Sequence, residues 1–234
     1  MRATICVPTY NERANLERLV EALAPHLREG DRILVIDDGS PDGTGKIADR
    51  LAAELPYIDV LHRPVKTGLG PAYLAGFERA LAGDAELVLE MDCDFSHNPA
   101  DVPRLIAAAE GGADVVLGSR YVDGGGVTDW GFVRRAISRG ASVYTSLFLR
   151  MGVKDPTGGF KCFRRRVLET LDLNTITASG YTFQIEVTFL ARRAGFRIVE
   201  VPIVFSDRER GRSKMSRAIV LEAIWRVPLL RVRR

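Results

Sequence analysis

Short apolar runs alternate with amphipathic stretches through the first half of the chain. The apolar, often β-branched runs predict strands at residues 4–7, 32–36, 58–61, 87–91 and 115–117. Apolar positions at helical spacing predict helices between them, at about residues 16–27, 44–55, 71–81 and 99–109. Strands separated by helices need crossover connections, so the pattern predicts an α/β fold with a mostly parallel sheet. In such sheets ligands bind beyond the carboxyl ends of the strands.

The second half of the chain is less regular. Residues 124–126 are three consecutive glycines that mark a flexible loop, and a further Gly-rich turn is expected at residues 155–159. Helices are predicted at about residues 133–151 and 183–194, and a strand at residues 197–204. No linker or internal repeat separates the two halves, so residues 1–214 are expected to form one domain around a single site.

Residues 215–234 form a basic tail. A helix over residues 215–230 would be apolar almost all round, so something must cover it. Residues 197–234 contain ten Lys or Arg and four Asp or Glu, although the whole chain has a net charge of only +3. These features favour a helix that lies in the membrane interface, with the anionic membrane surface as its partner. Packing of this helix on the protein core, or a truncated chain, are the alternatives.

Composition excludes several classes of protein. The chain has 234 residues, of which 46% are hydrophobic and 27% charged, as in a globular domain. No apolar run approaches the ~20 residues needed to span a bilayer, and residues 1–8 do not resemble a signal peptide. Cys6, Cys93 and Cys162 are far apart with no CxxC pair, so neither a disulfide framework nor a zinc site is expected. The chain is therefore expected to fold in the cytoplasm.

Polar residues follow the first two predicted strands. The sequence VPTYNE at residues 7–12 ends the first strand with Pro8, after which Tyr10 and Glu12 offer a stacking ring and an acceptor. The sequence DDGSPDGT at residues 37–44 places Asp38 at the tip of the second strand, where it can accept from a base or ribose. A turn with a helix cap at position 42 or 44 is the structural interpretation, and the two are compatible.

Two acids follow the fourth predicted strand. Asp92 and Asp94 alternate along a segment taken to be extended, so their carboxylates are expected to point the same way and converge on one cation. Two hard oxygen ligands, with water and phosphate oxygens at the other positions, suit Mg²⁺ or Mn²⁺. His97 shows no metal-ligand spacing with another histidine and is interpreted as a local structural residue.

Basic residues occur near the other strand ends. Arg120 follows the fifth strand, Arg134 opens the helix beyond it, and Arg208 and Lys214 frame a Gly-containing loop. The planar guanidinium group pairs well with phosphate. A single such arginine is usually a surface charge, but several around an acid pair indicate a site for phosphate groups bound together with a metal.

In order and spacing, these motifs resemble family 2 glycosyltransferases, and more closely the polyprenol-phosphate (dolichol-phosphate) mannose synthases. The resemblance covers residues 5–214. It rests on VPTYNE at 7–12, DDGSPDGT at 37–44, MDCDFSH at 91–97, GSRY at 118–121, DPTGGFKCF at 155–163, SGYTFQIE at 179–186 and DRERGRSKMS at 207–216.

The resemblance implies a GT-A fold and residue roles. Residues expected at the nucleotide sugar are Pro8, Tyr10, Glu12, Ile36, Asp38, Asp92, Cys93, Asp94, Ser96 and Arg120. Asp92 and Asp94 would also bind the metal. Residues expected at phosphate are Arg120, Arg134, Arg208 and Lys214. Asp94, Arg120 and Arg134 are the implied catalytic residues. Ser96 is a departure, because family members often have Gln there; the shorter side chain leaves room for a water molecule.

The resemblance also implies a reaction: transfer of mannose from GDP-mannose to a polyprenyl monophosphate, with inversion at the anomeric carbon. The second pKa of a phosphate monoester is near ~6, so the acceptor is already an anion at neutral pH and no catalytic base is expected. The enzyme would associate peripherally with the cytoplasmic face of a membrane. The alternatives are transfer of glucose or another sugar to the same lipid or to a polysaccharide, and a non-catalytic nucleotide-sugar binding module. Nucleic acid is not expected, since no aromatic residues are interleaved with the basic ones.

Overall fold

The computed structural model describes residues 1–176, 180–207 and 227–231. Within these residues the main sheet has seven strands in the order β3-β2-β1-β4-β7-β5-β8. The strands are β1 Ala3–Thr9, β2 Arg32–Asp37, β3 Ile58–His62, β4 Leu87–Glu90, β5 Val115–Ser119, β7 Lys161–Arg164 and β8 Ile198–Pro202. All neighbouring strands pair in parallel except β7, which is antiparallel to both β4 and β5. The prediction of a mostly parallel sheet is confirmed.

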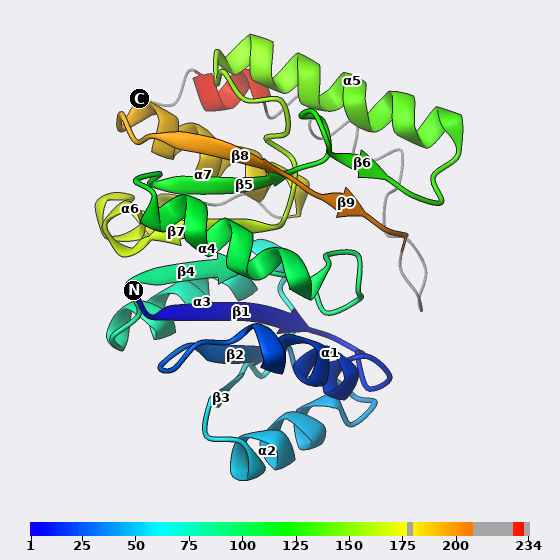
Figure 1. Cartoon of the computed structure of the whole chain (residues 1–234), viewed down its shortest axis with the longest axis vertical. Helices are drawn as coiled ribbons and strands as arrows, with labels where there is room; N and C mark the ends of the chain where they lie inside the picture. The colour runs from blue at the N-terminus through cyan, green and yellow to red at the C-terminus, as the bar shows by residue number, and fades with distance from the viewer. Residues whose placement is uncertain (177–179, 208–226, 232–234) are drawn as a thin grey trace.

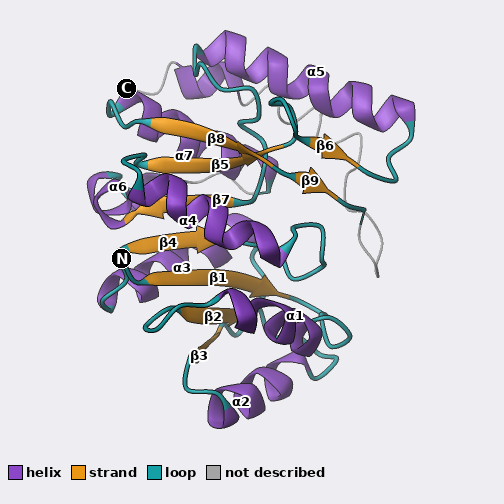
Figure 2. Cartoon of the chain, in the orientation of Figure 1, coloured by secondary structure: helices purple, strands orange, loops and turns teal. Residues whose placement is uncertain are grey.

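Helices cover both faces of this sheet (Figures 1 and 2). One apolar core lies between the sheet and α1 Leu16–Leu23, α2 Thr44–Glu54 and α4 Val102–Glu110. The other lies between the sheet and α3 Leu69–Ala82, α6 Arg165–Thr170 and α7 Tyr181–Arg193. The strands of such a sheet are buried on both faces, so their sequences are continuous apolar runs. These runs are why the sequence pattern predicted the positions of the parallel strands.

Helix and strand boundaries differ from prediction where proline intervenes. The helix predicted to reach residue 27 ends at Leu23, and a short 3₁₀ turn, η1 Ala24–His26, follows with Pro25 in its first turn. Helix α4 is likewise preceded by η2 Pro99–Asp101. The single strand predicted at residues 197–204 is two strands, since β8 ends at Pro202 and β9 Val204–Phe205 joins a second sheet. Proline cannot donate a ladder or helix hydrogen bond, which accounts for these breaks.

The second sheet consists of β6 Gly126–Val127 and β9, paired in parallel. It follows a tight loop after β5, in which a Cβ on Gly125 would lie 2.5 Å from the Ser119 carbonyl oxygen, so only glycine fits there. Beyond β9, the Ser206 amide donates to the Ser96 carbonyl at 3.3 Å. This small sheet therefore lies against the loop that follows β4.

Helix α5, Phe132–Leu149, forms one end of the molecule in Figure 1. Its inward face carries Ser138, Ser142, Thr145 and Leu149. Its outward face carries large apolar side chains that are exposed, namely Phe132, Val133, Ile137, Val143, Tyr144 and Leu147. The usual amphipathic order, apolar inward and polar outward, is thus inverted.

Most of the tail predicted at residues 215–234 lies outside the described residues. A helical turn is present at residues 227–231, where Val227 and Leu230 are buried in the core shared with α7. Arg231 Nη1 donates to the Phe148 carbonyl at 3.2 Å. This turn therefore packs on the protein, as the alternative interpretation of the tail expected. Among the described residues, no helix is both long and apolar enough to span a bilayer.

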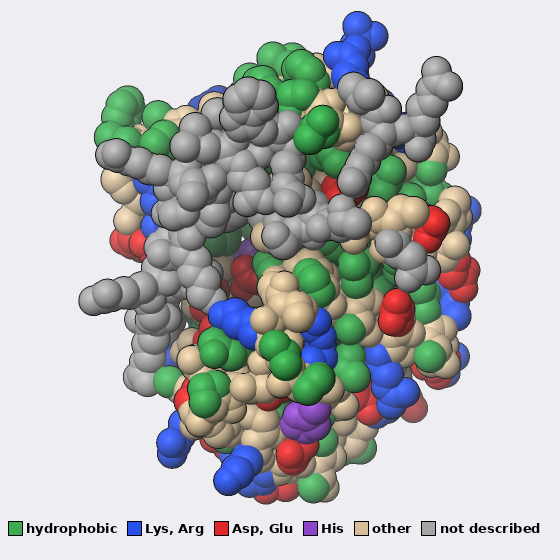
Figure 3. Space-filling view, turned by 180° about the vertical axis from the view of Figure 1, so that it is seen from behind, with side chains coloured by type: hydrophobic (Ala, Val, Ile, Leu, Met, Phe, Trp, Pro, Cys, Tyr) green, Lys and Arg blue, Asp and Glu red, His purple; other side chains and the backbone are tan. Residues whose placement is uncertain are grey.

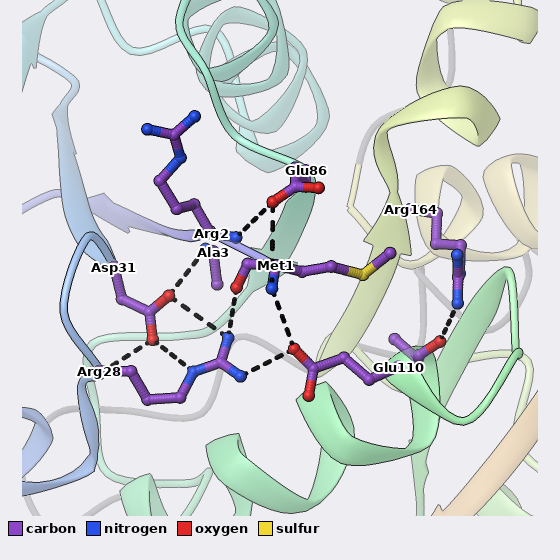
Figure 4. Close-up of polar contacts among 9 residues, drawn as sticks. Met1, Arg2, Ala3, Arg28, Asp31, Glu86, Glu110 and Arg164 are labelled. Atoms are coloured by element: carbon purple, nitrogen blue, oxygen red, sulfur yellow. Dashed lines mark hydrogen bonds and ion pairs between the residues drawn. The ribbon is translucent and has the colours of Figure 1, made fainter.

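A network of ion pairs holds the amino ends of the strands together (Figure 4). Asp31 accepts from the Ala3 amide at 2.8 Å and from the backbone amide and Nε of Arg28. Arg28 also pairs with Glu110 at 2.8 Å, and the N-terminal ammonium of Met1 lies 3.3 Å from the same carboxylate. These contacts tie β1 to the segment before β2 and to the end of α4.

Candidate active site

The loop after β1 is fastened to the loop after β2. The backbone amides of Asn11, Glu12 and Arg13 donate to the side chains of Ser40, Thr44 and Asp42, respectively, at 3.0–3.1 Å. Asp42 also accepts from the Thr44 amide at the start of α2. The N-cap position is Gly43, which makes no side-chain cap hydrogen bond, so the cap predicted at position 42 or 44 is wrong by one residue. The two motifs VPTYNE and DDGSPDGT therefore form one continuous surface at the carboxyl ends of the strands.

The two acids of DDGSPDGT have different partners. Asp37 accepts from the backbone amide and the hydroxyl of Ser40, which closes the turn. Asp38 pairs with Arg63, in the loop after β3. Burial raises the pKa of Asp38, and the positive charge of Arg63 opposes that rise. Asp38 lies at the strand tip, as predicted, but sequence reasoning missed Arg63.

Of the other residues expected at the nucleoside, two are partly exposed and one is buried in the core. Tyr10 is half-buried, and the Lys66 ammonium lies 3.6 Å from its ring centroid, a cation–π contact. Pro8 is half-buried and pairs in register with Ile36. The Ile36 side chain is fully buried and packs on α3. Its side chain thus belongs to the core of the protein.

The acid pair follows β4, but the segment is not extended. β4 ends at Glu90, residues 93–97 form a bend, and Phe95 has a φ of +62°. The argument from strand alternation was therefore wrong, and local hydrogen bonds orient the acids instead. The Asp92 amide donates to His97 Nδ1 at 3.2 Å, and the Ser96 amide donates to Asp94 Oδ1 at 3.1 Å.

Cys93 lies between the two acids in the chain and is buried. Burial raises the pKa of this thiol, and the negative charges of Glu12, Asp94 and Asp92 raise it further. The Arg18 guanidinium carbon of α1 lies 4.9 Å from the centroid of the Phe95 ring, so the bend that contains the acids lies next to the start of α1. His97 stacks on Phe160 with the ring centroids 4.9 Å apart, which supports its interpretation as a structural residue.

The residues present fit a divalent metal ion. Carboxylate oxygens of Asp92 and Asp94 are the hard donors that Mg²⁺ and Mn²⁺ prefer. Ser96 Oγ is buried and has no hydrogen-bond partner among the described residues, so an oxygen next to Asp94 is left over. The described residues contain no group of three or more His, Cys, Asp or Glu side chains arranged to hold an ion.

Arg120 is buried and held by Asp155. Its Nε and Nη2 donate to the two carboxylate oxygens of Asp155, each at 2.7 Å, and Nη2 also reaches Thr157 Oγ1 at 2.8 Å. Burial alone would raise the pKa of Asp155, but the charge and hydrogen bonds of Arg120 outweigh it and lower that pKa. The motifs GSRY and DPTGGF, far apart in sequence, are joined by this bidentate pair.

Arg134 lies close to the same place. Its guanidinium carbon is 4.1 Å from the ring centroid of Trp130, whereas that of Arg120 is 5.8 Å from it. Arg134 Nη1 pairs with Asp207 Oδ2 at 3.0 Å. The structure thus places two of the predicted phosphate-binding residues around one indole. The other two, Arg208 and Lys214, lie outside the described residues.

Two buried ionisable side chains, Glu90 and Lys161, lie behind the acids and were not predicted. Glu90 and Lys161 are opposite each other on β4 and β7, and both side chains are fully buried. Burial raises the pKa of Glu90 to about 7 and lowers that of Lys161 to about 8. The Lys161 ammonium donates to the Gln184 carbonyl at 2.7 Å and to Thr188 Oγ1 at 2.8 Å. The sequence does contain a signal for these two residues, because a charged residue within an apolar strand is unusual.

Comparisons with known proteins identify the family of the chain. The profile of "Glycosyl transferase family 2" matches residues 4–172. A polyprenol monophosphomannose synthase of Mycolicibacterium smegmatis is 46% identical over 97% of this chain and 85% of its own length. An undecaprenyl-phosphate mannosyltransferase of Micrococcus luteus is 46% identical over 96% of this chain and 91% of its own. A dolichol-phosphate mannosyltransferase of Pyrococcus furiosus is 38% identical over 95% of this chain, which spans 61% of that protein.

Among solved structures, glucosyl-3-phosphoglycerate synthase of Mycobacterium tuberculosis, in complex with phosphoglyceric acid, matches with a TM-score of 0.72. The identity is 21%, over 98% of this chain and 79% of the other. The same enzyme has been solved with Mn²⁺ and uridine diphosphate. At this identity the likeness establishes the fold alone, and the GT-A architecture implied by the motifs is confirmed. With its strand-end acids in place and the family profile matching most of its length, the chain belongs to glycosyl transferase family 2.

Proposed function

We propose that this enzyme transfers mannose from GDP-mannose to a polyprenyl monophosphate, with Mg²⁺ or Mn²⁺ as cofactor. The observation that carries the proposal is the gathering of the acid pair, the nucleoside-side loops and two arginines at one edge of the sheet. The names of the relatives at 46% identity support mannose as the sugar and a polyprenyl phosphate as the acceptor.

The donor nucleoside would bind at the joined loops after β1 and β2. Tyr10 offers its ring, and Asp38 and Glu12 offer acceptors, in agreement with the roles that the family resemblance implies. Lys66 and Arg63 now contact Tyr10 and Asp38. A bound nucleoside diphosphate would share or replace these contacts, and it would bring negative charge to two cations already in place.

Asp92 and Asp94 would hold the metal, which neutralises charge on the diphosphate leaving group. Hydrogen bonds to the bend at residues 93–97 hold the backbone of Asp92 and the carboxylate of Asp94 before substrate arrives. Such preorganisation avoids a reorganisation cost during the reaction. Neither acid is needed as a base in this scheme.

The acceptor phosphate would bind near Arg134 and Arg120. Arg134 is paired with the partly exposed carboxylate of Asp207, which a phosphate dianion can replace. Arg120 is fixed by Asp155 and would orient the site without moving. The phosphate oxygen is already ionised near neutral pH, so it attacks the anomeric carbon with no proton to remove, and displacement inverts that carbon.

We also propose that α5 rests on the cytoplasmic face of a membrane. Its outward stripe includes Phe132 at 85% and Leu147 at 73% exposure. Figure 3 shows hydrophobic side chains at the end of the molecule where Figure 1 places α5. Arg135 and Arg139 are exposed beside the stripe, as expected for a helix lying among anionic headgroups. A lipid acceptor makes such a position useful, because Arg134 lies on the same helix.

The activity test uses radiolabelled GDP-mannose and a short-chain polyprenyl phosphate. Asp92→Asn should reduce lipid-linked product by more than about 100-fold, since losing a metal ligand exceeds the 10–100-fold loss for an outer partner. Chelation should abolish transfer, and Mg²⁺ or Mn²⁺ should restore it. Asp59→Asn, which removes a carboxylate paired with Arg32 elsewhere in the sheet, is the matched control. Transfer that survives both Asp92→Asn and chelation would refute the metal assignment.

A donor panel separates the remaining alternatives. Product formed from a glucose donor and not from GDP-mannose would reassign the sugar while keeping the reaction class. Tight binding of nucleotide sugars without transfer to any acceptor would favour the non-catalytic binding module.

The membrane test is co-sedimentation with vesicles of phosphatidylethanolamine and phosphatidylglycerol. Phe132→Ser combined with Leu147→Ser should lower the bound fraction several-fold, because two large apolar side chains no longer insert. Val65→Ser changes an exposed apolar residue in the loop after β3 and should bind as the wild type does. Equal binding by all three proteins would rule out α5 as the contact.

A further inference from the structure

Tyr73 is a core residue with one polar atom at the candidate active site. It lies on α3 and its side chain is fully buried. Its ring stacks against Phe77 and Phe183, with both pairs of centroids 6.1 Å apart and interplanar angles of 27° and 6°. The Phe77 and Phe183 rings are themselves 6.4 Å apart, so the three rings form one packed aromatic cluster. Close packing of the buried Tyr73 ring in this cluster sets the direction of its hydroxyl group.

The hydroxyl group of Tyr73 donates to Asp92 Oδ1 at 3.3 Å. No other hydrogen bond of this hydroxyl is recorded within the described part of the chain. Burial raises the pKa of Tyr73 well above its usual value, and the nearby charges of Asp92 and Glu90 raise it further. A carboxylate oxygen can only accept, so the phenol is the donor in this contact.

Asp92 is thus held at two points. Its backbone amide donates to His97, and one carboxylate oxygen accepts from Tyr73. The other oxygen, Oδ2, lies 4.0 Å from the position that a Cβ on Gly159 would occupy. A carboxylate two residues past the end of its strand would otherwise rotate among several rotamers.

We propose that Tyr73 is a positioning residue, which orients the Asp92 carboxylate for the divalent ion. This role rests on the metal site of the proposed function. Outer hydrogen-bond partners of metal ligands fix ligand orientation, and their loss typically weakens metal binding 10- to 100-fold. Phenylalanine would fill the core equally well, as its two neighbours Phe77 and Phe183 do, so packing alone does not account for the hydroxyl group.

The test measures Mn²⁺ affinity by electron paramagnetic resonance of the free ion, with GDP present and, separately, with UDP. Tyr73→Phe should weaken Mn²⁺ binding by about 10- to 100-fold. Its melting temperature should fall by only a few degrees, because one buried hydrogen bond is lost. Tyr121→Phe is the matched control: it loses a hydroxyl hydrogen bond to Ser138 and leaves both acids untouched. Its Mn²⁺ affinity should equal that of the wild type.

A second variant separates positioning from packing. Phe77→Leu disturbs the aromatic stack but keeps the Tyr73 hydroxyl group. It should lower the melting temperature more than Tyr73→Phe does and weaken Mn²⁺ binding less. Mn²⁺ affinity of Tyr73→Phe equal to the wild type, or a loss no greater than that of Phe77→Leu, would overturn the role of Tyr73. Absence of Mn²⁺ binding by the wild-type protein would instead refute the metal site itself, and the role of Tyr73 with it.

Discussion

Polar groups at the amino ends and at the carboxyl ends of the strands differ in whether they have hydrogen-bond partners. At the amino ends, charged groups are matched: Asp31 accepts four backbone or side-chain N–H groups, and Glu110 pairs with both Arg28 and the N-terminus (Figure 4). Some buried polar atoms have no hydrogen-bond partner among the described residues. They lie at the carboxyl ends of the strands and at the starts of the helices that follow. These atoms belong to Asn15, Ser96, Trp130 and Arg134.

This difference separates stability from function. A buried polar atom without a partner costs about 1–3 kcal/mol, so folding alone would favour its removal. Proteins keep such groups mainly where a ligand, ion or water completes them. The amino ends therefore serve the fold, and the carboxyl ends retain hydrogen-bonding capacity that would be available to the proposed substrate and metal.

The strongest test of this contrast is Asp31→Ala at the amino ends. The variant leaves the buried Ala3 amide without its acceptor and should lower the free energy of unfolding by about 1–3 kcal/mol. Mannosyl transfer and Mn²⁺ affinity should stay at wild-type values at a temperature where the variant is folded. Urea unfolding and the transfer assay measure the two quantities.

Asp84→Ala is the control for that variant. It removes an exposed carboxylate that pairs with Arg2 near the same ends of the strands, and exposed pairs contribute only about 0–1 kcal/mol. A loss of transfer in Asp31→Ala in proportion to its loss of stability would show that the two ends of the strands are coupled. The contrast would then fail.

Sequence pattern predicted the sheet well because each parallel strand is a buried run between helices of clear periodicity. It missed β7, which is four residues long and contains buried Lys161, and the two-residue strands β6 and β9. Such short segments adopt a strand conformation because they pair with other strands. They are too short to show the alternation of apolar and polar residues that predicts a strand. The pattern also predicted α5 but not which of its faces is buried, since the polar face is the inward one.

At the site, Asp38, Asp92 and Asp94 could be found because acids beyond strand ends are unusual and share one edge of the sheet. Tyr73 and Asp155 could not. Tyr73 occupies an apolar position on α3, where its periodicity indicates a core residue and nothing more. The pairing of Asp155 with Arg120 depends on a turn that returns 35 residues later in the chain, a distance that local pattern does not bridge.

Ser96→Ala tests the same contrast at the carboxyl ends of the strands and should have the smallest effect on stability. It removes a buried hydroxyl group with no partner among the described residues, so the free energy of unfolding should stay equal or rise by up to about 1 kcal/mol. Mn²⁺-dependent binding of GDP should nevertheless weaken by a few-fold, because an oxygen beside Asp94 is lost. Calorimetric titration and urea unfolding measure the two quantities.

Ser146→Ala is the matched variant, since it removes a serine hydroxyl that donates to the Val153 carbonyl. It should lose about 1 kcal/mol of stability and keep its affinity for nucleotide. If Ser96→Ala lost stability as Ser146→Ala does and bound GDP normally, Ser96 would be an ordinary structural serine. The unpartnered atoms at the carboxyl ends of the strands would then be a cost of folding with no link to the metal. The opposite pattern, affinity lost and stability kept, ties at least one of them to the chemistry of the site.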